Sequence, residues 1–103
     1  MASKFESLIR KYCYANGITI PVGFGRNTPS RYSIVLLDSP PKLVAATWSK
    51  LADVAYFVEG HAQRNRVPAV GSHLRILDFK DLTELSYLGK ARFGKGPSFR
   101  IPD

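Results

Sequence analysis

The feature that most constrains the fold is an amphipathic stretch near the start of the chain. Five apolar side chains recur there with the helical spacing i, i+3, i+4, i+7 and i+8: Phe5, Leu8, Ile9, Tyr12 and Cys13. Ser3 and Glu6 have the spacing of a capping box, and Asn16-Gly17 is a typical helix end. These signals predict a helix over residues 4–15 that buries one face, with Cys13 in the core.

Three later segments have the composition of β-strands. Residues 18–24 and 31–39 are rich in strand-forming residues and are bounded by turn residues, and residues 72–79 alternate in polarity after Gly71. Pro21 lacks a backbone donor, which favours an edge position for the first of these strands.

The stretch over residues 40–64 permits two interpretations. Its apolar residues fit one helix of about 36 Å, but a strand of seven residues spans only about 23 Å, so such a helix would overhang the sheet. In the alternative, residues 42–48 return as the second strand of a hairpin, and Ser49 caps a helix over residues 50–63. We favour the hairpin.

Residues 80–89 place Leu82, Leu85 and Leu88 three apart, which predicts a short helix ended by Gly89. The fold class is therefore α+β, with a small, mainly antiparallel sheet of three to four strands and two or three helices packed on one face. The length of 103 residues suits one domain. We assign residues 1–88 to this domain and residues 89–103 to a basic C-terminal tail that contains Gly and Pro.

Several functional classes are disfavoured by motifs that the sequence lacks. The two histidines and the single cysteine form no metal-binding spacing, and no nucleophile elbow or phosphate-binding loop is present. We therefore expect neither an enzyme nor a bound cofactor or metal.

The chain has no apolar run of transmembrane length and no signal peptide, and one cysteine suits a reducing compartment, so we expect a cytoplasmic protein.

The charge distribution points to an acidic partner. The formal net charge is +7, and the excess of basic residues lies in the first half and in residues 89–103. Residues 24–31 and 93–100 share the order Phe-Gly-basic followed by Pro-Ser and a second basic residue. Such segments could stack bases on their rings and contact phosphates with their cations.

We therefore predict a small non-catalytic protein that contacts nucleic acid through these segments. The proposed contact residues are Arg26, Arg31, Lys90, Arg92, Phe93, Lys95, Phe99 and Arg100. Phe24 and Phe93 could equally be core anchors, and base stacking fails if they are buried. The alternative is an adaptor or inhibitor module that binds an acidic protein, which an exposed aromatic and aliphatic patch would favour.

Overall fold

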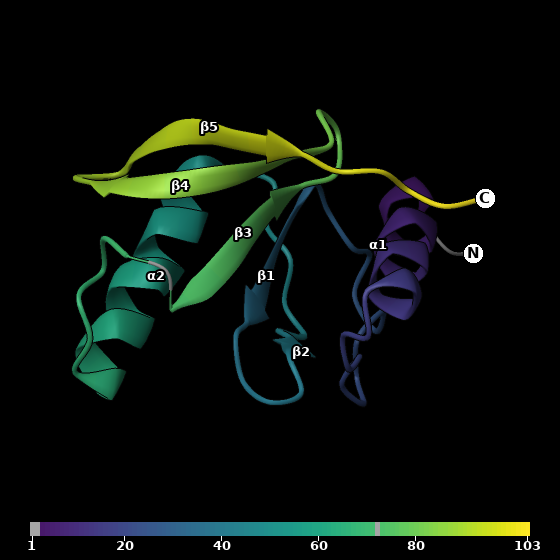
Figure 1. Cartoon of the computed structure of the whole chain (residues 1–103), viewed down its shortest axis with the longest axis horizontal. Coiled ribbons are helices and arrows are strands. Elements are labelled where there is room, and N and C mark those ends of the chain that lie inside the picture. Colours follow the sequence, from purple (N-terminus) through teal and green to yellow (C-terminus); the bar gives the residue numbers. More distant parts are fainter. Residues whose placement is uncertain (1–2, 72) are drawn as a thin grey trace.

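The computed structural model describes residues 3–71 and 73–103, which form two helices and a five-stranded sheet (Figure 1). The elements in chain order are α1 (Lys4–Ala15), β1 (Tyr32–Leu36), β2 (Lys42–Leu43), α2 (Leu51–Asn65), β3 (Leu74–Asp78), β4 (Thr83–Gly89) and β5 (Arg92–Ser98). The strand order is β2-β1-β3-β4-β5, and every neighbouring pair is antiparallel. The α+β class is confirmed, with one strand more than the sequence predicts.

Helix α1 has the predicted bounds and the predicted caps. The Ser3 hydroxyl accepts a hydrogen bond of 3.0 Å from the Glu6 amide, and Asn16 ends the helix. Tyr12 and Cys13 are buried on its inner face, as the apolar spacing predicts.

The two helices cover opposite faces of the sheet. Successive side chains of a strand point to opposite faces, and in β1 Val35 packs in the cluster that contains α1, whereas Ile34 packs in the cluster that contains α2. In β3, Leu77 packs in the cluster that contains α1, and Ile76 packs in the cluster that contains α2. The prediction of helices on one face is therefore wrong. The central strands β1 and β3 are apolar on both faces, which requires cover on both sides.

The choice of a hairpin over one helix for residues 40–64 is confirmed, but the predicted strand over residues 42–48 is limited to Lys42–Leu43 and a bridge at Trp48. Strand β2 pairs with β1 through Leu43 and Val35, and an isolated bridge joins Trp48 to Tyr32. Helix α2 begins at Leu51, and the residue at its N-cap position is Lys50 without a side-chain bond, so Ser49 is not the cap.

Residues 18–24 do not form the predicted strand. Their only strand-like contact among the described residues is a parallel bridge between Thr19 and Lys42. Pro21 accepts a turn hydrogen bond from the Phe24 amide at 3.2 Å, and Gly23 between them has a φ of 99°. This turn breaks the extended backbone and buries the Phe24 ring in the core.

Instead of the predicted helix over residues 80–89, residues 80–82 form a turn and Thr83–Gly89 form β4. Leu85 lies opposite Ile76 of β3, and Tyr87 lies opposite Phe93 of β5. The leucine spacing fits a helix over so short a window, but pairing with strands on both sides outweighs it. Ser72, at the start of the predicted strand 72–79, lies outside the described residues.

The segment assigned to a tail contains a strand of the sheet. Residues 92–98 form β5, which pairs with β4 and occupies one edge of the sheet. Beyond it, Phe99 donates its amide to Leu82 and packs against the α1 cluster. Among the described residues, no helix has the length and apolar character needed to cross a membrane.

Candidate functional site

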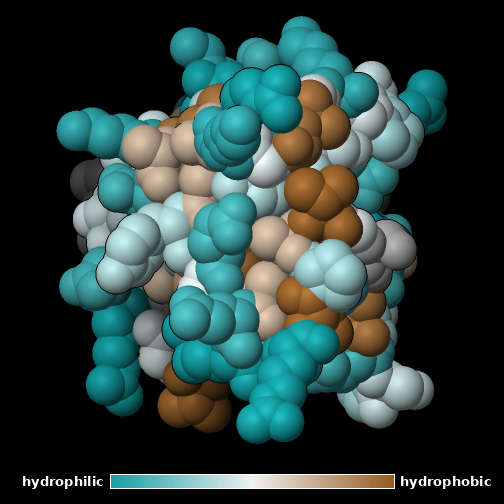
Figure 2. All heavy atoms as spheres, turned by 90° about the vertical axis from the view of Figure 1, so that its left-hand side faces the viewer, coloured by the Kyte–Doolittle hydropathy of each residue, from teal (hydrophilic) through white to brown (hydrophobic). Residues whose placement is uncertain are grey.

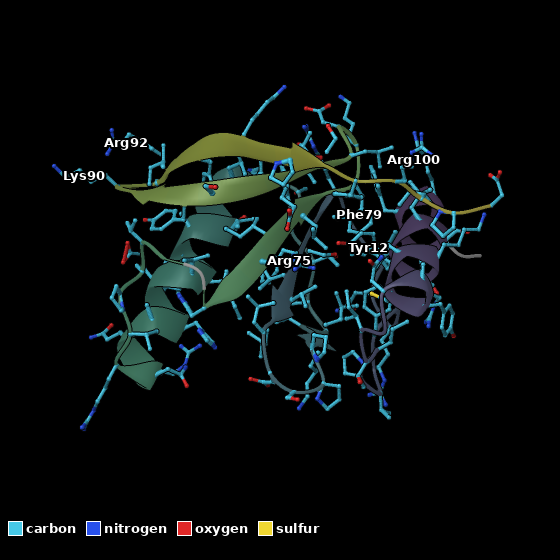
Figure 3. The ribbon with its side chains drawn as sticks, viewed as in Figure 1. Tyr12, Arg75, Phe79, Lys90, Arg92 and Arg100 are labelled. Atoms are coloured by element: carbon cyan, nitrogen blue, oxygen red, sulfur yellow. The ribbon has the colours of Figure 1, made fainter. Side chains whose placement is uncertain are left out.

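The predicted cations do not form one cluster. Figure 3 shows Lys90 and Arg92 at one end of the β4–β5 hairpin and Arg100 beyond its other end, near α1. Lys95 is exposed within β5 between them. Arg26 lies in the loop between α1 and β1, where it lines a hollow that none of the other predicted residues lines.

Arg31 is neutralised by a structural ion pair and is not a free phosphate ligand. Its guanidinium donates two bonds of 2.7 Å to the Asp78 carboxylate and one of 3.2 Å to Asp81. Hydrogen bonding to Asp78 raises the pKa of Arg31. Burial opposes ionisation of Asp78, but the bonds from Arg31 and from the Lys80 and Asp81 amides outweigh it and lower the pKa of this carboxyl.

The aromatic rings proposed to stack on bases are held in the two cores. Phe24 is buried. Half-buried Phe99 packs on Tyr12, with ring centroids 4.8 Å apart, and half-buried Phe93 packs on Tyr87 at 5.2 Å. Stacking a base on these rings would require them to leave the core, which removes the main argument for single-stranded nucleic acid.

The turn between β4 and β5 is held in an unusual backbone conformation. Lys90 and Ala91 have φ angles of 52° and 57°, in the left-handed region where a side chain costs about 1–2 kcal/mol. Two-residue hairpin turns with a positive φ at both residues normally contain Asn-Gly. The Ala91 amide donates to the hydroxyl of Tyr87 at 3.2 Å, and this hydroxyl donates to Glu59 of α2 at 2.7 Å. The turn is thus tied to the sheet and to the helix beneath it.

The strained turn presents two exposed cations in a fixed arrangement. The Arg92 guanidinium donates to the carbonyls of Leu88 and Gly89 at 3.3 Å, which holds it beside the end of β4. Lys90 is exposed at the tip of the hairpin. No acidic residue occurs between Glu84 and Asp103, so no carboxylate within this segment offsets these charges.

Beside the turn lies a shallow apolar groove. Three exposed aliphatic side chains line it, and they come from the end of β1, the loop before β3 and strand β4: Leu37, Val70 and Leu88. The groove has a volume of about 530 Å³ and extends along the sheet to Pro97 of β5. Figure 2 shows apolar side chains gathered in a band on the side of the molecule that carries α2 and the hairpin tip. We call Leu37, Val70, Leu88, Lys90 and Arg92 together the hairpin surface.

Sequence reasoning found the cations of the hairpin surface but missed its apolar part. The sequence placed Leu88 on one side of a short helix with Leu82 and Leu85, whereas it lies in β4 and is 46% exposed. Val70 and Leu37 lie outside the regular elements, at 54% and 43% exposure, and no periodic pattern marks them.

The two histidines of the chain lie against each other. The described residues contain no group of three or more His, Cys, Asp and Glu side chains that could hold a metal ion. His61 and His73 stack with ring centroids 5.3 Å apart, and their Nδ1 and Nε2 atoms, respectively, are buried without hydrogen-bond partners. Burial lowers the pKa of His61, with further lowering by His73 and Arg64.

No protein-family model, curated protein or solved structure matches this chain. The hairpin surface therefore has to be interpreted from its own chemistry.

Proposed function

We propose that the protein is a small non-catalytic interaction module that binds an acidic protein through the hairpin surface. The observation that supports this most directly is the strained turn at Lys90 and Ala91, which is anchored by Tyr87 and places two cations beside exposed aliphatic side chains. Left-handed backbone at non-glycine residues is costly and is found at functional sites where the surroundings enforce it.

The composition of the surface suits a protein partner better than a nucleic acid. Exposed aliphatic groups that line one groove, such as Leu37 and Leu88, gain free energy by leaving water at a protein interface. Phosphate backbones offer no apolar complement to these groups, and the Phe93 ring of the same hairpin is half-buried against Tyr87. The cations select a partner with carboxylates and steer its approach.

The experiment is site-specific photocrosslinking in the cell that makes the protein. A photoreactive amino acid replaces Leu88, and in the matched control it replaces Val22, which is 97% exposed in the α1–β1 loop. We expect position 88, and not position 22, to trap a protein through an acid-rich segment. Adding Lys90→Glu and Arg92→Glu should abolish the product, whereas Lys11→Glu on α1 should not.

Two results would overturn the proposal. One is the absence of any product specific to position 88 when the protein is folded. The other is a product that contains nucleic acid, which would favour binding through the phosphate backbone.

A further inference from the structure

We infer that the partner binds by strand addition: an extended acidic segment pairs with the outer edge of β5 as a sixth strand. This inference rests on the proposed function, because it states how the acidic protein is held. Strand addition uses main-chain hydrogen bonds for affinity and alternate side chains for specificity.

Strand β5 offers an edge of sufficient length. It is the last strand in the order β2-β1-β3-β4-β5 and pairs only with β4 among the described residues. Its seven residues span about 23 Å, and β2 at the other edge has two residues. Pro97 has no amide donor, and the pairing with β4 shifts register between Lys95 and Ser98, so the regular part of the edge is residues 92–95.

Charge identifies the occupant of this edge. Lys95 is exposed in the middle of β5 and lies opposite Leu85, and Arg92 begins the strand. A second copy of β5 would bring its own Lys95 and Arg92 against these cations, and like charges on neighbouring strands destabilise pairing. The lysine and the proline thus protect the edge from self-association, while a strand with Glu or Asp opposite Lys95 converts the repulsion into attraction.

The edge is continuous with the hairpin surface. Gly94 presents no side chain, and the Leu88 side chain lies beside it, 3.5 Å from where a Cβ would be. The groove that contains Leu88 reaches Pro97 of the same strand. An added strand can therefore place apolar side chains toward the groove and acidic ones beside Lys95.

A defined peptide tests this mode of binding. The probe is an N-acetylated ten-residue peptide of alternating Glu and Val, labelled for fluorescence anisotropy. Its control carries N-methyl groups on two consecutive central residues, which block donors on both edges of the peptide and keep its charge. We expect the control to bind at least about tenfold more weakly. With the unmodified probe, the amides of residues 92–95 that face the open edge should exchange more slowly.

Variants test the location. Lys95→Glu should weaken binding about tenfold or more, because it places a carboxylate against those of the probe. Lys42→Glu, an exposed lysine on the edge strand β2, is the matched control and should leave the affinity within about twofold. Unchanged far-ultraviolet circular dichroism would show that each variant is folded.

Several outcomes would overturn strand addition. Equal affinity for the two peptides would show attraction by charge alone. The β5 edge would be refuted as the site if the unmodified probe does not bind. It would also be refuted if Lys42→Glu weakens binding as much as Lys95→Glu does. If position 88 still traps an acidic protein in these cases, the proposed function stands without strand addition. If position 88 traps no protein, the proposed function itself fails, whatever the peptides do.

Discussion

Replacing Arg31 tests whether the central ion pair is structural. The Arg31 side chain is 28% exposed and that of Asp78 only 4%, so Arg31→Met leaves a carboxylate in the core without its counter-charge. Breaking such a pair from one side costs about 3–5 kcal/mol. Because Asp78 keeps hydrogen bonds from the Lys80 and Asp81 amides, we expect the lower end, about 3 kcal/mol.

Urea unfolding measures this effect. With a slope of about 1–3 kcal/mol per M, the midpoint should fall by about 1–3 M. Arg75→Met is the matched control, because the Arg75–Glu84 pair is more exposed, at 39% and 26%, and such pairs contribute about 0.2–1 kcal/mol. A loss below about 1 kcal/mol for Arg31→Met would refute the structural role.

The same pair predicts the sign of a pH dependence. The lowered pKa of Asp78 means that its contribution is present above the ordinary value of 3.8 and is lost as pH falls through the lowered folded value. In Arg31→Met, the bonds from Arg31 that lower the pKa of this carboxyl are lost, while burial still raises it. The difference in unfolding free energy between wild type and variant should therefore shrink as the solution is acidified below about pH 4.

Three further measurements test other parts of the structure. Burial raises the pKa of the Cys13 thiol to about 11, so alkylation at pH 8 should be slow in the native protein and fast in urea, and rapid native modification would refute its burial. Because the pKa of His61 is lowered in the folded protein, the unfolded chain binds more protons as pH falls below about 6.5, and the free energy of unfolding declines. Urea unfolding of His61→Phe should show a smaller decline. An unchanged decline would contradict this assignment. Ala91→Gly should raise the free energy of unfolding by about 0.5–1 kcal/mol by relieving left-handed backbone strain, and a loss of stability would contradict the strain.

Local signals predicted the parts of the fold that depend on local interactions. Ser3 and Glu6 cap α1 as their spacing indicates, and the choice of a hairpin for residues 40–64 followed from comparing helix and strand lengths. Strand β4 was missed because its strand character depends on two partners, one of which, β5, contains Gly and Pro and was taken for a tail.

The candidate site was predicted only in part, because the sequence shows its charges but not its tertiary contacts. Charge identified Lys90 and Arg92, whose exposure needs no tertiary information. The neutralisation of Arg31 by Asp78, 47 residues away, is invisible in a sequence, as is the exposure of Leu88, which depends on strand register. The turn at Lys90 and Ala91 carries none of the usual Asn-Gly signal.

The packing of Phe99 on Tyr12 and Phe79 joins the first helix to the last part of the described chain, which has a consequence for synthesis on the ribosome. At about 5–20 residues per second, the 84 residues from Ala15 to Phe99 take about 4–17 s to translate. For part of this time the apolar face of α1 lies outside the ribosome, while the Phe99 that completes its cover does not yet exist. Nascent chains arrested before residue 99 should therefore bind chaperones or aggregate, and release should depend on the synthesis of Phe99.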